Sequence, residues 1–209
     1  MQPKPEQITR IKAAVFAVCL IPLALLVWRA LTGGLTANPI EDITHHTGWW
    51  TLTFLMVTLS VTPLRLLLNA PWLLRLRRML GLFAFFYASL HFSTWLVLDQ
   101  FFDWDAMLKD IVKRPYITIG FTAFVLLTPL AATSTNAMVR RLGARRWQAL
   151  HRLVYVIAIL GVTHFWWLVK KDIREPLAFA MLLAILFAIR AWHALGKRRR
   201  GSAVMQRTL

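Results

Sequence analysis

The chain has 209 residues, of which 58% are hydrophobic and 16% charged, and its formal net charge is +16. A soluble domain is normally about one quarter charged, so this composition excludes soluble enzymes. The shortage of polar residues also excludes a nucleic-acid-binding protein, despite the basic charge. The 13 Phe and 10 Trp residues exclude a disordered chain. The class that remains is an integral membrane protein whose apolar surface contacts lipid.

Stretches of about 20 mostly apolar residues, enough to cross a hydrocarbon core about 30 Å thick, occur six times. We expect spans at roughly 11–31, 47–68, 79–98, 115–132, 147–169 and 176–195. The first span has the basic start of a signal peptide, but no clear cleavage site follows it and five more spans do, so we interpret it as an anchor. The sequence predicts an all-α membrane protein, a six-transmembrane-helix bundle formed by a single domain over residues 1–209.

The Lys and Arg residues fall mainly on one side of these spans. The side with the N-terminus, the second and fourth connections and the C-terminal tail carries 18 of the 25 basic residues and one of the nine acidic residues, Glu6. Cytoplasmic loops are the ones enriched in Lys and Arg. We therefore expect both termini in the cytoplasm, as an even number of spans requires.

Three of the six histidines, His91, His151 and His164, fall inside predicted spans. At 1.5 Å per residue, His91 lies roughly 18 Å above the cytoplasmic boundary, His151 roughly 6 Å and His164 roughly 25 Å. On an ideal helix the side chains of His151 and His164 point about 140° apart, so they share a face only if the helix bends. Height therefore favours His91 and His164 as an outer pair, and it leaves His151 near the cytoplasm without an obvious second histidine.

Ionisable groups inside a membrane are costly and are therefore functional candidates. Neutral imidazole is a good ligand for haem iron, and helical bundles hold b-type haem between histidines of facing helices. The alternative is that each histidine only forms a hydrogen bond between helices. Haem ligation by His91, His151 and His164, with one or two haems, is the hypothesis that these residues favour.

Further candidates lie near the predicted membrane boundaries. Arg77, Arg78 and Arg152 are placed to neutralise haem propionates at the cytoplasmic side, although they are equally well explained as ordinary positive-inside residues. His46, at the outer edge of the second span, is a candidate donor in a quinone site. The one cysteine, Cys19, lies in an apolar run and is predicted to be a small core residue.

A series of short motifs along nearly the whole chain resembles a known family. The matching segments are Gly33 to Leu35, Asn38-Pro39, Gly48, Arg77 to Leu82, Leu90-His91, Arg114 to Tyr116, Thr133 to Thr135, Leu142-Gly143, Arg146 to His151, Tyr155 and His164. Together they resemble the MsrQ (YedZ) family of haem-binding membrane subunits, within the ferric reductase and NADPH oxidase transmembrane superfamily.

This resemblance implies that His91, His151 and His164 match the family's haem-binding histidines. It implies a partner, a periplasmic molybdopterin-containing MsrP-like reductase that repairs oxidised methionines, and a place in the bacterial inner membrane. It also implies an FMN and electrons drawn from the quinone pool or from a cytosolic flavin reductase. The larger oxidases of the superfamily carry a second histidine in the third span, where this chain has Arg77, 14 residues before His91.

The sequence thus predicts a haem b electron-transfer subunit with no catalytic residue of its own. No nucleotide-binding motif is present, and only about 14 residues follow the sixth span. We therefore expect the electron donor and the catalytic subunit to be separate chains. The alternatives are a self-sufficient ferric or quinone reductase and a small proton-coupled transporter.

Overall fold

The computed structural model describes residues 2–169 and 172–207, and the backbone alone for 197–207. Helices make up 87% of these described residues, which confirms the all-α class. Lys170 and Lys171 of the sequence-based charge count lie outside the described residues, as do the side chains of Lys197 to Arg200 and of Arg207.

Six helices are long and apolar enough to cross a membrane, as predicted. Helix α1 (Pro5–Leu31), α2 (Pro39–Leu67), α5 (Pro115–Ala132) and α9 (Arg174–Arg207) are unbroken. The third span joins a 3-10 turn, η1 (Pro71–Leu73), to α3 (Leu74–Ser93) and a π-helical turn, η2 (Thr94–Asp99). The fifth joins α7 (Ala144–His151) to α8 (Leu153–Leu168). The short helices α4 (Trp104–Lys113) and α6 (Asn136–Leu142) lie in connections.

Local chemistry explains where several helices begin. Pro39 and Pro115 stand at the first helical position, where the missing N–H costs no hydrogen bond. The side chain of Asn38 caps α2 by accepting from the Glu41 N–H at 3.4 Å. Gly143, with φ of 75°, turns the chain between α6 and α7. These residues set where the helices begin and therefore where the connections before them end.

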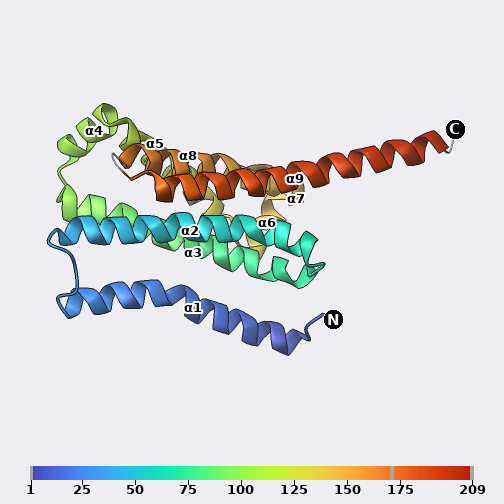
Figure 1. Cartoon of the computed structure of the whole chain (residues 1–209), viewed down its shortest axis with the longest axis horizontal. Helices are drawn as coiled ribbons and strands as arrows, with labels where there is room; N and C mark the ends of the chain where they lie inside the picture. Colours follow the sequence, from blue (N-terminus) through green and yellow to red (C-terminus); the bar gives the residue numbers. More distant parts are fainter. Residues whose placement is uncertain (1, 170–171, 208–209) are drawn as a thin grey trace.

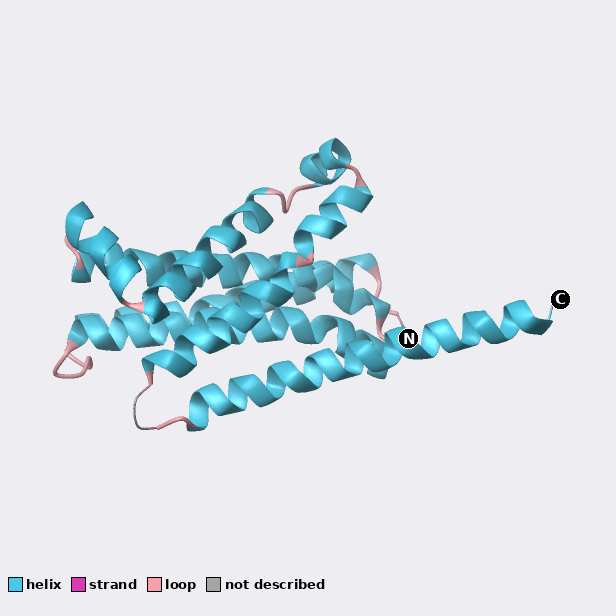
Figure 2. Cartoon of the chain, turned by 90° about the horizontal axis from the view of Figure 1, so that it is seen from above, coloured by secondary structure: helices cyan, strands magenta, loops and turns pink. Residues whose placement is uncertain are grey.

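Helix α1 begins and α9 ends at the same end of the bundle, which we call the terminal end, and α4 lies at the opposite, distal end (Figure 1). Seen from above, α9 continues well past the other helices at the terminal end (Figure 2). The aromatic side chains of α2 and α3 form the middle of the core, with the rings of Phe54 and Tyr87 stacked at 5.1 Å and those of Phe54 and Phe83 at 5.7 Å.

The backbone of helix α1 runs at a distance from those of α2 and α3 (Figure 1). Side chains bridge this distance: Phe16 of α1 packs on Phe83 of α3 with ring centroids 5.1 Å apart, and polar contacts add to this packing. Pro22 removes one backbone donor within α1. The fully buried Tyr87 of α3 contacts the α1 backbone next to this proline. Its hydroxyl donates to the Cys19 carbonyl at 2.9 Å and accepts from the Leu23 N–H at 3.1 Å. Tyr87 thus bonds to two backbone groups of α1 that lie one helical turn apart. Cys19 itself is buried, as predicted.

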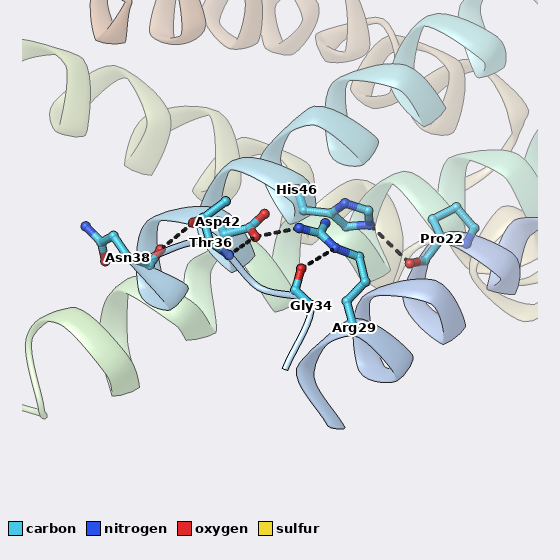
Figure 3. A network of polar contacts seen from close by, with 7 residues as sticks. All are labelled: Pro22, Arg29, Gly34, Thr36, Asn38, Asp42 and His46. Atoms are coloured by element: carbon cyan, nitrogen blue, oxygen red, sulfur yellow. Dashed lines mark hydrogen bonds and ion pairs between the residues drawn. The ribbon is translucent and has the colours of Figure 1, made fainter. Parts of the chain in front are cut away.

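A second attachment lies at the distal end of α1 (Figure 3). Arg29 of α1 forms an ion pair with Asp42 of α2 at 2.6 Å, and the Thr36 N–H donates to the same carboxylate at 3.0 Å. His46 of α2 faces the Pro22 carbonyl with Nε2 at 3.1 Å, and since a carbonyl only accepts, Nε2 donates. These contacts hold α1 against α2 at the proline and in the part of α1 that follows it.

We expect Tyr87→Phe to lower the free energy of unfolding by about 1–3 kcal/mol, because it removes both hydrogen bonds of a fully buried hydroxyl. Thermal unfolding in detergent measures the loss. The matched variant is Tyr155→Phe, which changes a more exposed ring and should stay within about 0.5 kcal/mol of the unchanged protein. Equal stabilities of the two variants would contradict this role of Tyr87.

Candidate functional site

A cavity of about 530 Å³ opens in the distal half of the bundle, between α2, α3, η2, α5 and α8. Its walls are mostly apolar, and three histidines line it, His45 of α2, His91 of α3 and His164 of α8. Large apolar pockets with a few convergent polar groups are the usual form of a cofactor site. The distal cavity is therefore the main candidate site.

His91 and His164 lie against each other in this cavity. Their ring centroids are 6.1 Å apart and their planes meet at 73°. This proximity agrees with the height estimate that grouped them as the outer pair. Two imidazoles on opposite sides of one metal ion, each bonded through a nitrogen at about 2.0–2.1 Å, would have centroids about 6 Å apart. The observed separation therefore suits two axial ligands of a single iron.

Each of these rings is oriented by a backbone carbonyl at the distal end. His91 Nδ1 lies 3.0 Å from the Thr44 carbonyl oxygen, and His164 Nδ1 lies 2.7 Å from that of Tyr116. Because a carbonyl oxygen only accepts, Nδ1 carries the proton in both rings. Each Nε2 then keeps its lone pair, the form in which histidine binds a metal.

Two glycines make room for the rings. A Cβ at Gly48 of α2 would lie 2.9 Å from Cε1 of His91, and a Cβ at Gly120 of α5 would lie 2.7 Å from Nδ1 of His164. Such distances are far below ordinary van der Waals contact. Each imidazole therefore depends on a glycine in the helix it faces. The tautomer of the two imidazoles, the distance between them and the room left by the two glycines fit a haem held between His91 and His164.

His151 lies in a second cavity, of about 500 Å³, in the terminal half of the bundle. Leu55 and Leu127 line both cavities and so stand between them. The His151 ring stacks on Trp147 at 3.9 Å, and its Nε2 is 3.1 Å from the Thr133 hydroxyl oxygen. The Thr133 hydroxyl proton is donated to the Pro129 carbonyl at 2.6 Å, so Nε2 of His151 is the donor. His151 thus differs in environment from the distal pair.

The terminal cavity is rich in arginine. Arg77, Arg78 and Arg152, predicted as propionate partners, all line it. Arg190 of α9 lines it too, donating to the carbonyls of Leu186 and Leu59 and lying 5.6 Å from the Tyr155 ring centroid. No Asp or Glu is among its described lining residues. The cavity suits an anionic group.

His46 lines neither cavity within the described part of the chain. Its bond to Pro22 places it between α1 and α2, so the quinone role stays a prediction. The sequence did not indicate Gly120 or Arg190 as site residues, because their roles depend on how neighbouring helices pack.

The sequence predicted one continuous helix through His151 and His164, whereas the helix is interrupted at Arg152.

Comparisons with known proteins agree with this architecture. The family model described as "Ferric reductase like transmembrane component" matches residues 47–162, more than half of the chain. A protein of Herminiimonas arsenicoxydans named "Protein-methionine-sulfoxide reductase heme-binding subunit MsrQ" is 57% identical over 204 residues, 97% of this chain and 94% of its own length.

Two further proteins with the same name are similar over most of their length. That of Rhodospirillum rubrum is 54% identical over 192 residues, 92% of either chain. That of Ralstonia nicotianae is 51% identical over 200 residues, 95% of this chain and 92% of its own. The chain therefore belongs to the ferric reductase-like transmembrane family and, within it, to the MsrQ family.

Proposed function

We propose that this chain is a haem b electron-transfer subunit of the bacterial inner membrane. It passes electrons from the quinone pool or a cytosolic flavin reductase to a periplasmic, molybdopterin-containing methionine sulfoxide reductase of the MsrP type. The support comes from relatives named as heme-binding subunits of such a system and from the six spans. The catalytic subunit is a separate chain, and residues 1–209 act as one membrane domain.

The observation that carries this proposal is the facing pair of His91 and His164, whose rings lie 6.1 Å apart with Nδ1 bonded to backbone carbonyls. Each ring links two helices through Nδ1. Its Nε2 is left for another partner, at a cavity with mostly apolar walls. Haem iron supplies a one-electron ferric and ferrous couple when it is bound there.

The protein's own contribution is to hold and shield the site. The carbonyls of Thr44 and Tyr116 fix the tautomer and increase the basicity of the two imidazoles, as partners of ligating histidines do. The apolar walls keep water away and lower the local dielectric, which influences the redox potential. The chain thus tunes a potential and breaks no substrate bond.

The direction follows from the charge distribution. The arginine-rich terminal end is placed in the cytoplasm by the positive-inside rule, together with both termini. The distal end, which holds Glu41, Asp42 and Asp99, then faces the periplasm, where the reductase docks. The His91 and His164 pair lies in the half of the bundle nearer that acceptor.

The terminal cavity is the proposed entry for electrons. His151 has Arg77, Arg78 and Arg152 around it. Ligation of a second haem by His151 through Nε2 requires this nitrogen to exchange its Thr133 partner for the iron, and the same cavity is our candidate for the FMN that the family resemblance implies. Either group is anionic, as the lining requires. His46 remains the candidate quinone donor at the distal edge of α2.

We expect His91→Ala and His164→Ala each to abolish most of the reducible b-type absorption band of the protein purified in detergent, because one axial ligand is lost. His193→Ala is the matched control, since His193 is exposed near the terminal end, and should retain the band. A full band in both cavity variants would overturn the proposed haem site. Absence of any such band in the unchanged protein would overturn the function.

Gly120→Ala tests the cradle around His164. The added methyl overlaps the imidazole, and overpacking of this kind costs about 1–3 kcal/mol. We expect haem affinity to fall about tenfold, measured as haem per protein during titration of the apoprotein. Gly196→Ala meets nothing within 4 Å and should bind haem normally. The same affinity in both variants would rule out a cradle at Gly120.

A further inference from the structure

A buried hydroxyl connects the span that carries His91 with the helix beside it. Thr94 is the first residue of η2, directly after α3, and only 7% of it is exposed. It is not among the described lining residues of either cavity. Its hydroxyl donates to the His91 carbonyl at 2.7 Å and accepts from the Thr44 hydroxyl at 3.1 Å. Thr94 therefore joins the third span to α2 next to the ligand.

These contacts close a ring of hydrogen bonds with the bond that orients the imidazole. His91 Nδ1 donates to the Thr44 carbonyl at 3.0 Å. Thr94 has one hydroxyl proton, which goes to the His91 carbonyl, so the proton between the two hydroxyls comes from Thr44. The His91 side chain is thus bonded to the Thr44 backbone, and the Thr44 side chain is bonded through Thr94 to the His91 backbone.

The backbone at Thr94 departs from a regular α-helix. Thr94 opens the six-residue π-helical turn η2, and turns of this kind are frequent at functional sites. The Thr94 N–H also reaches the His91 carbonyl. Both donors of Thr94 therefore point back to the residue that carries the ligand, and a lone pair of its hydroxyl oxygen remains for Thr44.

One more hydroxyl lies near the Thr44 carbonyl. Thr47 Oγ1 is 3.1 Å from that oxygen and donates to the Ile43 carbonyl at a shorter distance, 2.8 Å. Both contacts stay within α2. Thr47 therefore cannot hold α2 at a fixed distance from the third span, whereas the bond between Thr44 and Thr94 does.

We propose that Thr94 is a positioning residue for the His91 ligand and acts through the Thr44 carbonyl on the orientation and basicity of the imidazole. This inference rests on the proposed function, since it concerns the haem held by His91 and His164. A carbonyl held in line with Nδ1–H makes the imidazole a stronger electron donor. A stronger donor stabilises ferric iron more than ferrous iron, because the ferric state carries one more positive charge. Thr94 thus lowers the potential without ligating the iron.

The test is a redox titration of the purified holoprotein carrying Thr94→Val. Valine keeps the branched shape of threonine but has no hydroxyl, so the Thr44 hydroxyl loses its acceptor and the Thr44 carbonyl is free to move away from Nδ1. Loss of a direct partner of a ligating histidine typically costs about 10–100-fold in metal affinity or activity. Thr94 is one bond further away, so we expect the ratio of ferrous to ferric haem at fixed potential to rise about threefold. That rise equals about 28 mV, at about 59 mV per tenfold for one electron.

Thr44→Val is a second variant, because it removes the donor of the same bond and keeps the carbonyl. It should raise the ratio by a similar factor. The double variant should differ little from either single variant, since both remove one and the same bond, whereas independent packing defects would add. The electron paramagnetic resonance signal of the ferric haem should shift in all three proteins, because the plane of the His91 ring is released.

Two controls separate the hydroxyl from general effects on folding. Thr94→Ser keeps the hydroxyl and should retain the potential. Thr163→Val is the matched control: Thr163 directly precedes His164, and its hydroxyl donates to the Ile159 carbonyl at 2.9 Å. That bond stays within α8, so its loss should change neither the potential nor the resonance signal.

An unchanged potential and an unchanged resonance signal in Thr94→Val would overturn this inference and leave the proposed function standing. Fully additive shifts in the double variant, or an equal shift in Thr163→Val, would overturn it as well. If Thr94→Val binds no haem, a raised potential in Thr44→Val supports the inference and an unchanged one overturns it. Absence of any b-type band in the unchanged protein would overturn the inference together with the proposed function.

Discussion

The site depends on two hydrogen bonds, from His91 Nδ1 to the Thr44 carbonyl and from His164 Nδ1 to the Tyr116 carbonyl. Each bond crosses from a span to the helix beside it, and each fixes which ring nitrogen carries the proton. Without them either ring could turn or change tautomer and leave no lone pair for a metal. The carbonyls belong to residues near the starts of α2 and α5, so the positions at which those helices begin determine the chemistry of the cavity.

The packing of the bundle follows from the same requirement. The imidazoles fit only because the facing helices carry glycine at positions 48 and 120. Polar side chains inside a bilayer must find partners within the protein, and Tyr87, His46 and Arg29 attach α1 in this way. The two halves of the bundle differ in charge: three histidines, two carboxylates and one arginine line the distal cavity, and four arginines line the terminal cavity together with His151.

The number and place of the spans were predictable because bilayer thickness sets their length, and all six were found. The spacing of His91 and His164 along their helices also grouped them correctly in height. The short helices α4 and α6 were missed, since neither is long enough to span a membrane. The helix break at Arg152 and the approach of Gly120 to His164 arise from contacts between helices that no local pattern encodes. Whether His151 binds a haem stays a prediction.

The central claim is that His91 and His164 are the two axial ligands of one haem iron. Electron paramagnetic resonance of the oxidised, purified protein tests it most directly, because the signal of ferric haem depends on the number of imidazole ligands and on the angle between their planes. The ring planes meet at 73°, close to perpendicular, so the account predicts a highly anisotropic low-spin signal that survives in His151→Ala. A high-spin signal, or the rhombic low-spin signal of parallel imidazoles, would contradict it.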